Sequence, residues 1–555
     1  MKFDLLREPW IPVVTCTGEL ENVGLEEVLN RAHEFRWLQG ESPTVTAALH
    51  RLLFALVLRV HFNRLGLTSW EERWSELWHR NSFPADRLDR YLDGDGGAPG
   101  FRDRFDLFGA RPFFQTVDIP EDIEGSVAKL TMFRAAGNNA TLFDHTIEDE
   151  RADLSPAEAA RWLVTVQAFD TGGLKVGKRS SQPSLGNNFA TVVIEGSNLR
   201  ETLLLNLPWA DDSLAPQSTT GDLPVWERGP SVFQDSEEAD KRGRDHSGPV
   251  DLLTWQSRHI LLRGREGDGG VTVHDAVVLP GPRLGLNLAG EEHMAAFHRT
   301  FTKKKNVRGK GVPSAWKPVQ LDELRGVWRH CRELLLADED SPSQREHLRP
   351  RNLDRVAALH EEQDGLPEST VYTLRVLGQQ LAPNPGAVET WLEEAVPAPV
   401  AVLRAKPWET RLGPLMGLAV EFADQVGDQL KLLEREYHAT LRDQPRKNAE
   451  RKLLLQWFWP RLTEHFNRYL VNLGEDIQTD QNAAFPHTEK WADTVEETAV
   501  RAQHRWAELL PRSSPRNVLA LAGCTTEFHK QVRGIREKFD RQMKSYDPRP
   551  RTEDE

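Results

Sequence analysis

The spacing of hydrophobic residues predicts a mixture of helices and short strands in the first 400 residues. Apolar side chains recur every three or four positions from Thr44 to Asn63, which predicts a helix with Thr44 as its N-cap. A second amphipathic helix is expected over 70–78. The segment Ser155-Pro156-Ala157-Glu158 has the form of a capping box with proline at the first helical position. A helix should therefore begin there and continue to about Phe169.

Other segments predict strands, loops and breaks. Residues 171–188 show no apolar period and are expected to form a loop, whereas 189–207 predict a strand, a turn and a short helix. Short apolar runs predict further strands at 260–262, 271–279 and 371–377. An amphipathic helix is expected over 319–336. Because prolines break regular structure, the segment 380–400, with four of them, is expected to be a linker.

The pattern changes near residue 410, where four long amphipathic stretches follow one another at 412–443, 446–473, 489–510 and 514–546. Each carries one apolar stripe with spacings of three and four residues. Short connections favour antiparallel neighbours, hence a four-helix bundle. We therefore predict an α+β fold, in which a large mixed α/β N-terminal domain (1–400) precedes a C-terminal four-helix bundle (401–555).

Composition narrows the class of protein. The 555 residues include 70 Lys and Arg against 84 Asp and Glu, a formal charge of −14, which argues against a protein that coats nucleic acid. The three cysteines, Cys16, Cys331 and Cys524, are too scattered for a zinc knuckle or a disulfide framework. We expect no metal site and a reducing, cytoplasmic location. No apolar run is long enough to predict a membrane-spanning helix.

One segment resembles a phosphate-binding loop. Residues 172–178, GGLKVGK, fit the pattern GxxxxGK, but Arg179 stands where a serine or threonine must hold magnesium. A capped helix, and not a buried strand, is expected before it. We interpret the segment as a flexible basic loop whose glycines allow close approach to DNA. The acidic cluster at 144–150 matches no recognised metal spacing, so neither a catalytic residue nor a cofactor is predicted.

Two basic islands stand out against the acidic whole. The segment 300–317 contains no acid and is flanked by Phe301 and Trp316; its cations suited to DNA phosphates are Lys303, Lys304, Lys305, Arg308 and Lys310. A second island lies at 442–452. An acidic chain with basic islands suits a protein that contacts DNA at a few places.

Several stretches together resemble the CasA family, the large subunits of the type I-E CRISPR Cascade complex. The stretches, in the order seen in that family, are FDLLREPWIPV (3–13), RPFFQTVDI (111–119), GNNATLFDH (137–145), QAFDTGGLKVGK (167–178) and EGSNLRETLLLNLPW (195–209). The resemblance implies a non-catalytic subunit that recognises the protospacer-adjacent motif in double-stranded DNA. It also implies a role in duplex opening, R-loop formation and docking of the helicase-nuclease. The implied partners are other Cascade subunits, crRNA and target DNA.

The resemblance also assigns individual residues. The family's glycine loop beside the motif falls on Gly172, Gly173, Lys175, Gly177 and Lys178. The loop that contacts the complex and the crRNA falls on Asn138, Asn139, Thr141, Leu142 and Phe143. The wedge hairpin falls on Asn384-Pro385-Gly386, with Pro385 in place of the usual glutamine; alternatively Gln379 or Gln380 takes that part. Arg283 is the cation nearest the family's minor-groove lysine.

Two other interpretations stay open at this point. The chain could be an enzyme, either a degenerate NTPase that uses Lys178 or a metal-dependent nuclease. It could also be a purely structural module whose bundle docks partners.

Overall fold

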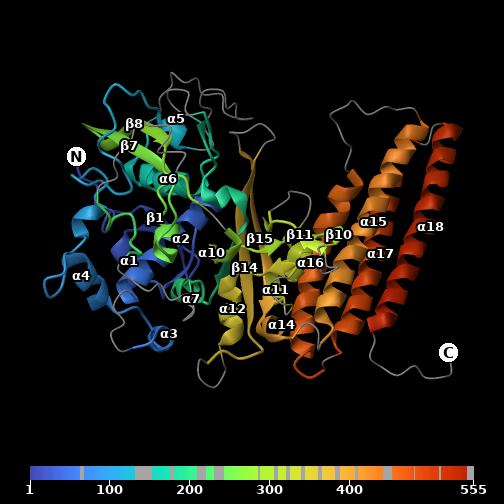
Figure 1. Ribbon diagram of the computed structural model, residues 1–555. Helices are drawn as coiled ribbons and strands as arrows, with labels where there is room; N and C mark the ends of the chain where they lie inside the picture. The colour runs from blue at the N-terminus through green and yellow to red at the C-terminus, as the bar shows by residue number, and fades with distance from the viewer. Residues whose placement is uncertain are drawn as a thin grey trace.

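The computed structural model describes the chain over residues 1–62, 68–131, 153–174, 180–208, 221–229, 243–285, 288–305, 311–320, 326–338, 340, 344–359, 365–381, 388–406, 410–441, 453–480, 482–511 and 514–546. A mixed α/β body, a central β-hairpin and a helical bundle follow one another from the N-terminus to the C-terminus (Figure 1).

The body is built around one apolar helix, α2 (Pro43–His61). Its N-cap is Ser42, whose hydroxyl accepts from the Val45 amide at 3.3 Å, so the prediction of Thr44 as cap was wrong. Pro43 fills the first helical position, where no N–H is needed. Among the described residues α2 is long and apolar enough to span a membrane, but 89% of that window is buried inside the protein, as in a core helix.

Small elements surround α2. The strands β2 (Leu20–Val23), β1 (Ile11–Thr15) and β3 (Phe35–Leu38) form one antiparallel sheet in that order. The helices on this side are α1 (Leu25–Asn30), α3 (Trp70–Trp78) and α4 (Ala85–Asp93), and a 3-10 turn η1 covers Arg102–Phe105. The predicted helix over 70–78 is confirmed.

The helix α6 (Pro156–Phe169) packs against α2. The Ser155 hydroxyl accepts from the Glu158 amide at 3.2 Å, which confirms the predicted start. The elements after α6 are β4 (Gly173–Leu174), β5 (Ser180–Ser181), η3 (Leu185–Asn188), β6 (Thr191–Glu195) and α7 (Leu199–Leu205). The last two confirm the strand, turn and helix predicted over 189–207.

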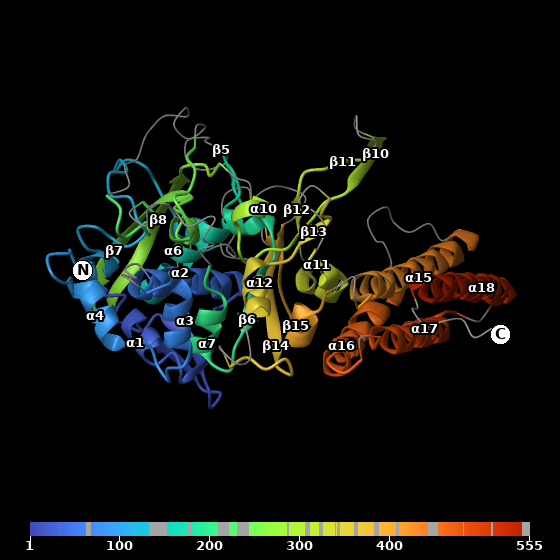
Figure 2. The ribbon, with the colours of Figure 1, turned by 60° about the horizontal axis from the view of Figure 1, so that its bottom comes forward.

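The predicted strands near 260 and 271 are confirmed as a longer antiparallel hairpin, β7 (Arg258–Gly267) and β8 (Gly270–Pro280). A small sheet has the order β12 (Lys317–Pro318), β9 (Phe297–His298) and β13 (His347–Leu348). A separate hairpin, β10 (Phe301–Lys305) with β11 (Gly311–Pro313), projects from the body (Figure 2). The short helices are α5 (Val127–Leu130), α9 (Pro249–Leu253), α10 (Leu288–Glu291) and α12 (Arg351–Ala358).

The central sheet has the order β15 (Val388–Pro399), β14 (Val371–Leu381) and β6, all antiparallel. The prediction of a linker over 380–400 was therefore wrong, because most of that segment is a twelve-residue strand. Pro397 lies opposite Thr373 in the register. Proline is tolerated here because β15 is an edge strand, where a missing N–H disrupts no second ladder.

The predicted helix over 319–336 is present only at its end, as η4 (Val327–His330) and α11 (Cys331–Leu335); residues 321–325 lie outside the described part. Trp328 explains the departure from a single amphipathic helix. Its indole is fully buried and stacks 4.7 Å from Phe466 and edge-on 5.4 Å from Trp491 in the bundle. This segment therefore joins the body to the bundle.

The C-terminal part begins with the short α14 (Val400–Arg404) and continues with four long helices. These are α15 (Leu412–Thr440), α16 (Leu453–Asp476), α17 (Ala484–Leu509) and α18 (Pro515–Tyr546). Their apolar stripes meet in one core, where Phe422 lies 4.8 Å from Phe539 and Tyr437 lies 5.3 Å from Trp506. The predicted α+β fold with a C-terminal bundle is confirmed.

Candidate nucleic-acid interface

The glycine segment after α6 forms a tight turn followed by a hairpin. Gly172 and Gly173 have φ angles of +80° and +94°, in the left-handed region that favours glycine. Gly173 pairs with Ser181, and Leu174 with Ser180. The predicted Lys175, Gly177 and Lys178 fall between β4 and β5 in the sequence and lie outside the described residues.

The two glycines differ in their surroundings. A Cβ on Gly172 would lie 2.7 Å from the Pro183 nitrogen and 2.8 Å from the Ser181 carbonyl oxygen, so a side chain there displaces backbone. A Cβ on Gly173 would meet no atom within 4 Å. Gly172 therefore shapes the turn, whereas Gly173 presents an open backbone face that a groove could approach.

A buried ion pair fixes this turn to the body. Asp170 caps the end of α6, and its carboxylate accepts from Arg258 Nε at 2.5 Å, with the two side chains 6% and 4% exposed. Arg258 Nη2 donates to the Gln182 carbonyl at 2.6 Å, on the return strand of the turn. The Gln167 side chain holds the Arg258 backbone through two further bonds of 2.8 and 3.0 Å. The guanidinium thus ties both ends of the glycine hairpin to β7.

Arg283 lies beside the same hairpin. A small pocket of about 100 Å³ is lined on one side by Ser181–Leu185 and on the other by Gly281–Leu284. Arg283 follows the end of β8, not the tip of the β7–β8 hairpin, and its side chain is half-buried. Within the described part of the chain its guanidinium has no carboxylate partner. The structure therefore brings Arg283 and the glycine turn together.

The β14–β15 hairpin is joined to the glycine turn through the end of β14 next to the connection between the two strands. Gln379 Nε2 donates to the Phe169 carbonyl at 3.0 Å and to Asn187 Oδ1 at 2.5 Å. Asn187 in turn donates to the Asp170 carbonyl at 2.7 Å. Gln379 and Gln380 are strand residues opposite Trp391 and Thr390, and the Gln379 amide is already engaged. The other wedge candidates, Asn384, Pro385 and Gly386, fall between β14 and β15 in the sequence and lie outside the described residues.

Other predicted groups are placed only in part. Lys303, Lys304 and Lys305 belong to β10, but the structure does not describe their side chains, nor any part of Arg308 and Lys310. Beside this hairpin the Arg299 guanidinium lies 4.1 Å from the Trp316 ring and 5.5 Å from Phe301. The predicted complex-contact residues Asn138, Asn139, Thr141, Leu142 and Phe143 and the acidic cluster at 144–150 also lie outside the described part.

The resemblance of 172–178 to a phosphate-binding loop does not extend to the fold. Such a loop follows a buried strand and opens a helix. Here α6 precedes the turn, and β5 and the 3-10 turn η3 follow it. The surroundings are those of a β-hairpin on a helix end.

Three residues that support the turn, Asp170, Asn187 and Arg258, were not predicted from the sequence, and Gln379 was named only as an alternative wedge. Asp170 stands two residues before Gly172, which is a usable local signal for a capping carboxylate. Arg258 is a buried cation at the start of an apolar strand, which predicts an ion pair but not its partner. For Gln379 the sequence gives no signal, because its partners are about two hundred residues away.

Taken together, these features define an α+β protein with an attached helical bundle, in which hydrogen bonds and a buried ion pair fix the candidate binding segments to the mixed α/β body. The sequence matches the family model for CRISPR-associated protein Cse1 over residues 4–502. It is 31% identical over 552 residues to CRISPR-associated protein CasA/Cse1 of Thermus thermophilus, covering 95% of this chain and 96% of that protein.

Solved structures agree with this match. The crystal structure of Thermobifida fusca Cse1 has a TM-score of 0.74 at 25% identity and covers 96% of this chain and 98% of that one. A chain of a CRISPR RNA-guided surveillance complex has the same fold, with a TM-score of 0.69 at 19% identity, over 95% of this chain and 99% of that one. The chain belongs to the Cse1 family, the CasA large subunits of the type I-E CRISPR Cascade complex.

Proposed function

We propose that this chain recognises the protospacer-adjacent motif in double-stranded DNA as the non-catalytic large subunit of a cytoplasmic Cascade complex. In this role it promotes duplex opening and R-loop formation, contacts crRNA and the other subunits, and docks the helicase-nuclease. Reading of the motif is assigned to the glycine turn, Arg283 and the tip of the β14–β15 hairpin.

The observation that carries the proposal is the convergence of these three segments on one buried anchor. The left-handed glycine turn, the pocket rim with Arg283 and the end of β14 that leads to β15 all meet around the Asp170–Arg258 pair. A loop held this rigidly can present backbone groups to a DNA groove at little entropic cost. Minor-groove acceptors vary little between base pairs, so shape and close approach matter there as much as hydrogen bonds.

The parts have different tasks in this proposal. The open face of Gly173 allows the backbone to approach the groove, and Arg283 supplies a cation beside it. An apolar wedge such as Pro385 at the tip of the β14–β15 hairpin would separate base steps after docking. R-loop formation and docking of the helicase-nuclease are supported by the family membership of the chain.

The direct test uses the reconstituted complex with and without this chain. Opening of a target duplex is measured by the fluorescence of 2-aminopurine placed next to the motif, and a duplex with an altered motif serves as the control. We expect opening only with the chain present and only on the duplex that carries the motif. Equal opening by the complex that lacks the chain would contradict the proposal.

The basic hairpin β10–β11 leads to a second prediction. Changing Lys303, Lys304 and Lys305 to alanine should weaken binding to every DNA sequence and flatten the dependence of affinity on salt. Each lysine that contacts a phosphate contributes about 0.9 to the logarithmic salt slope. Anisotropy titrations at several salt concentrations measure this slope.

The matched control is the pair Lys530→Ala and Lys538→Ala, which removes exposed lysines from α18. This pair should leave the salt slope nearly unchanged. A slope that stays the same in the β10 variant would show that these lysines do not contact DNA.

A further inference from the structure

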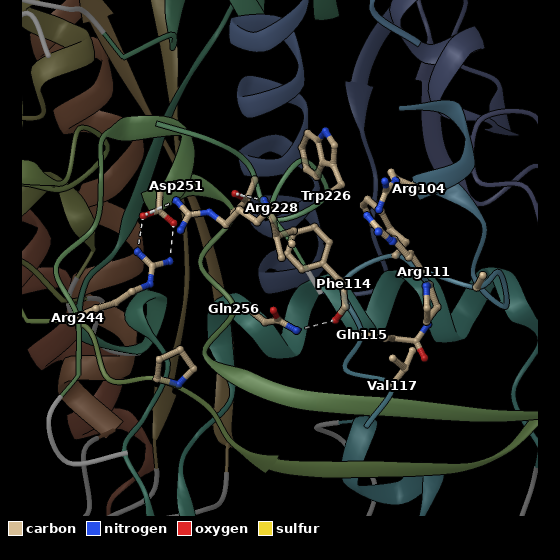
Figure 3. Close-up of a pocket in the computed structure, with 17 residues that line it drawn as sticks. Arg104, Arg111, Phe114, Gln115, Val117, Trp226, Arg228, Arg244, Asp251 and Gln256 are labelled. Atoms are coloured by element: carbon tan, nitrogen blue, oxygen red, sulfur yellow. Dashed lines mark hydrogen bonds and ion pairs between the residues drawn. The ribbon is translucent and has the colours of Figure 1, made fainter. Parts of the chain in front are cut away.

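A larger pocket, of about 380 Å³, lies next to the candidate interface and has no role so far. Three segments far apart in the sequence line it: 104–117, 225–229 and 244–256, together with Pro282. Figure 3 shows Arg228, Arg244 and Asp251 on one side of it and Arg104 and Arg111 on the other, with Phe114 and Trp226 between them.

The lining is strongly cationic. Four arginines line the pocket (Arg104, Arg111, Arg228 and Arg244), together with a single carboxylate, Asp251. The oxygens of Asp251 are already occupied by hydrogen-bond donors. The carboxylate accepts from Arg244 at 2.6 and 2.8 Å and from the Ser247 amide at 2.8 Å, and it lies 2.9 Å from Arg228. Burial alone would raise the pKa of Asp251, yet these donors hold it below its ordinary value. The carboxylate is therefore ionised and has little capacity left for the other cations.

The positive charges of the other three arginines are only partly balanced by carboxylates among the described residues. Among the described residues, the Arg104 guanidinium forms an ion pair only with the exposed Asp103, at 3.2 Å. Arg111 is exposed and, among the described residues, forms no ion pair. Burial lowers the pKa of Arg228, and its Nη2 atom, although close to Asp251, is buried without a well-aligned hydrogen bond. A bound anion would complete the coordination of these groups.

An aromatic wall lies between the two groups of arginines. The Phe113 and Trp226 rings stack at 5.9 Å, and Phe114 adjoins both. Phe114 has a φ of +56°, which is strained for a bulky residue. The strained backbone is held by its neighbour, Gln115, which donates to the Leu107 carbonyl and accepts from the Leu262 amide, both at 2.8 Å. Strain that the surroundings enforce in this way is typical of a functional position.

The pocket shares a wall with the candidate interface. Pro282 lines this pocket and also the small pocket beside the glycine turn. Arg244 belongs to the larger pocket, and its amide donates to the Arg283 carbonyl at 2.9 Å. A DNA strand that crosses the 281–284 segment would therefore reach the arginines next.

We propose that this pocket binds one nucleotide unit of a DNA strand, with the phosphate between the arginines and the sugar or base against the Phe114–Trp226 wall. Guanidinium groups match the geometry of phosphate oxygens, and an aromatic wall accepts any base. The volume suits a ligand larger than a phosphate alone. The inference extends the proposed function, because the strand is target DNA that leaves the candidate interface past Pro282.

The test is calorimetric titration of the full chain with thymidine 5′-monophosphate and, separately, with inorganic phosphate. We expect Arg111→Gln to weaken nucleotide binding by about tenfold, as loss of a charge-assisted bond would. The control, Arg90→Gln on the exposed face of α4, should bind the nucleotide as the wild type does. Because Arg111 is exposed, its replacement should leave the fold intact.

Three outcomes would overturn the inference: no saturable binding of the nucleotide, equal affinity in the Arg111→Gln variant, or binding of inorganic phosphate as tightly as the nucleotide. The last would show a simple anion site that makes no use of the aromatic wall. Failure here is separable from failure of the proposed function. The Arg111→Gln complex would still distinguish motif from non-motif DNA if only the pocket inference is wrong, and a Gly173→Asp complex would still lose that distinction.

Discussion

Replacing Arg258 with glutamine is expected to lower the free energy of unfolding by about 3–5 kcal/mol, the usual cost of removing one member of a buried ion pair. The buried Asp170 carboxylate would lose the charge-assisted bond from Arg258, and the Gln182 carbonyl would lose its donor. Because the same guanidinium holds both ends of the glycine turn, the variant should also lose most of its preference for motif-bearing DNA. Urea unfolding of the full chain and binding titrations of the complex measure the two effects.

Two comparison variants separate stability from positioning. Arg59→Gln breaks another buried pair, with Glu227, which makes no contact with the described residues of the glycine turn. It should destabilise the chain to a similar degree and leave the DNA preference unchanged. Replacing Asp170 and Arg258 together by leucine should restore part of the stability, because neither charge of the pair then stays buried. If Arg258→Gln unfolds at the same urea concentration as the wild type, the anchor has no energetic importance.

Changing Gly172 or Gly173 to aspartate should reduce affinity for motif-bearing DNA by roughly tenfold or more, in the range of one lost base contact, and affect other DNA much less. The two variants should act by different routes. At Gly172 the Cβ would collide with the backbone of Ser181 and Pro183 and deform the turn. At Gly173 the carboxylate would stand on the open face and oppose the approach of the DNA groove.

Alanine variants separate these routes. Gly172→Ala should already impair motif recognition, whereas Gly173→Ala should cost only the left-handed strain, about 1 kcal/mol. Anisotropy titrations on two duplexes that differ only in the motif measure the effect. Gly534→Asp, at an open position in α18, adds the same charge to the bundle and should change neither affinity. Equal losses on both duplexes for the Gly173→Asp variant would contradict the assignment of the turn to motif reading.

Elements with a strong local period were predicted well from the sequence. The helix α3, the start of α6 and the four bundle helices follow from apolar spacing and capping residues that act within one turn. The errors occurred where long-range packing decides. Pro397 suggests a break in regular structure, but it lies in β15, at the edge of the central sheet. Trp328 suggests the apolar face of a helix over 319–336, but its side chain packs in the core of the bundle.

In the candidate interface, too, local features could be predicted from the sequence and long-range contacts could not. The glycine pair of the turn could be found from the sequence, because its left-handed backbone is a local property. Its supports could not, since Arg258 meets Asp170 across 88 residues and Gln379 meets Phe169 across 210. Pairings of this range leave no period in the sequence. In each pair, neither residue alone indicates its role in supporting the turn until the fold brings the two together.

The central sheet also sets the order in which the molecule can assemble during synthesis. Because β6 pairs with β14, Thr191 finds its partner, Leu377, only after most of the body has left the ribosome. The same holds for the Gln379 bond that ties the end of β14 to the glycine turn. Helices such as α2 and α6 can form early, but closing so long a loop is slow. A nascent chain should therefore acquire its motif-reading surface late, as one of the last steps before the bundle is added.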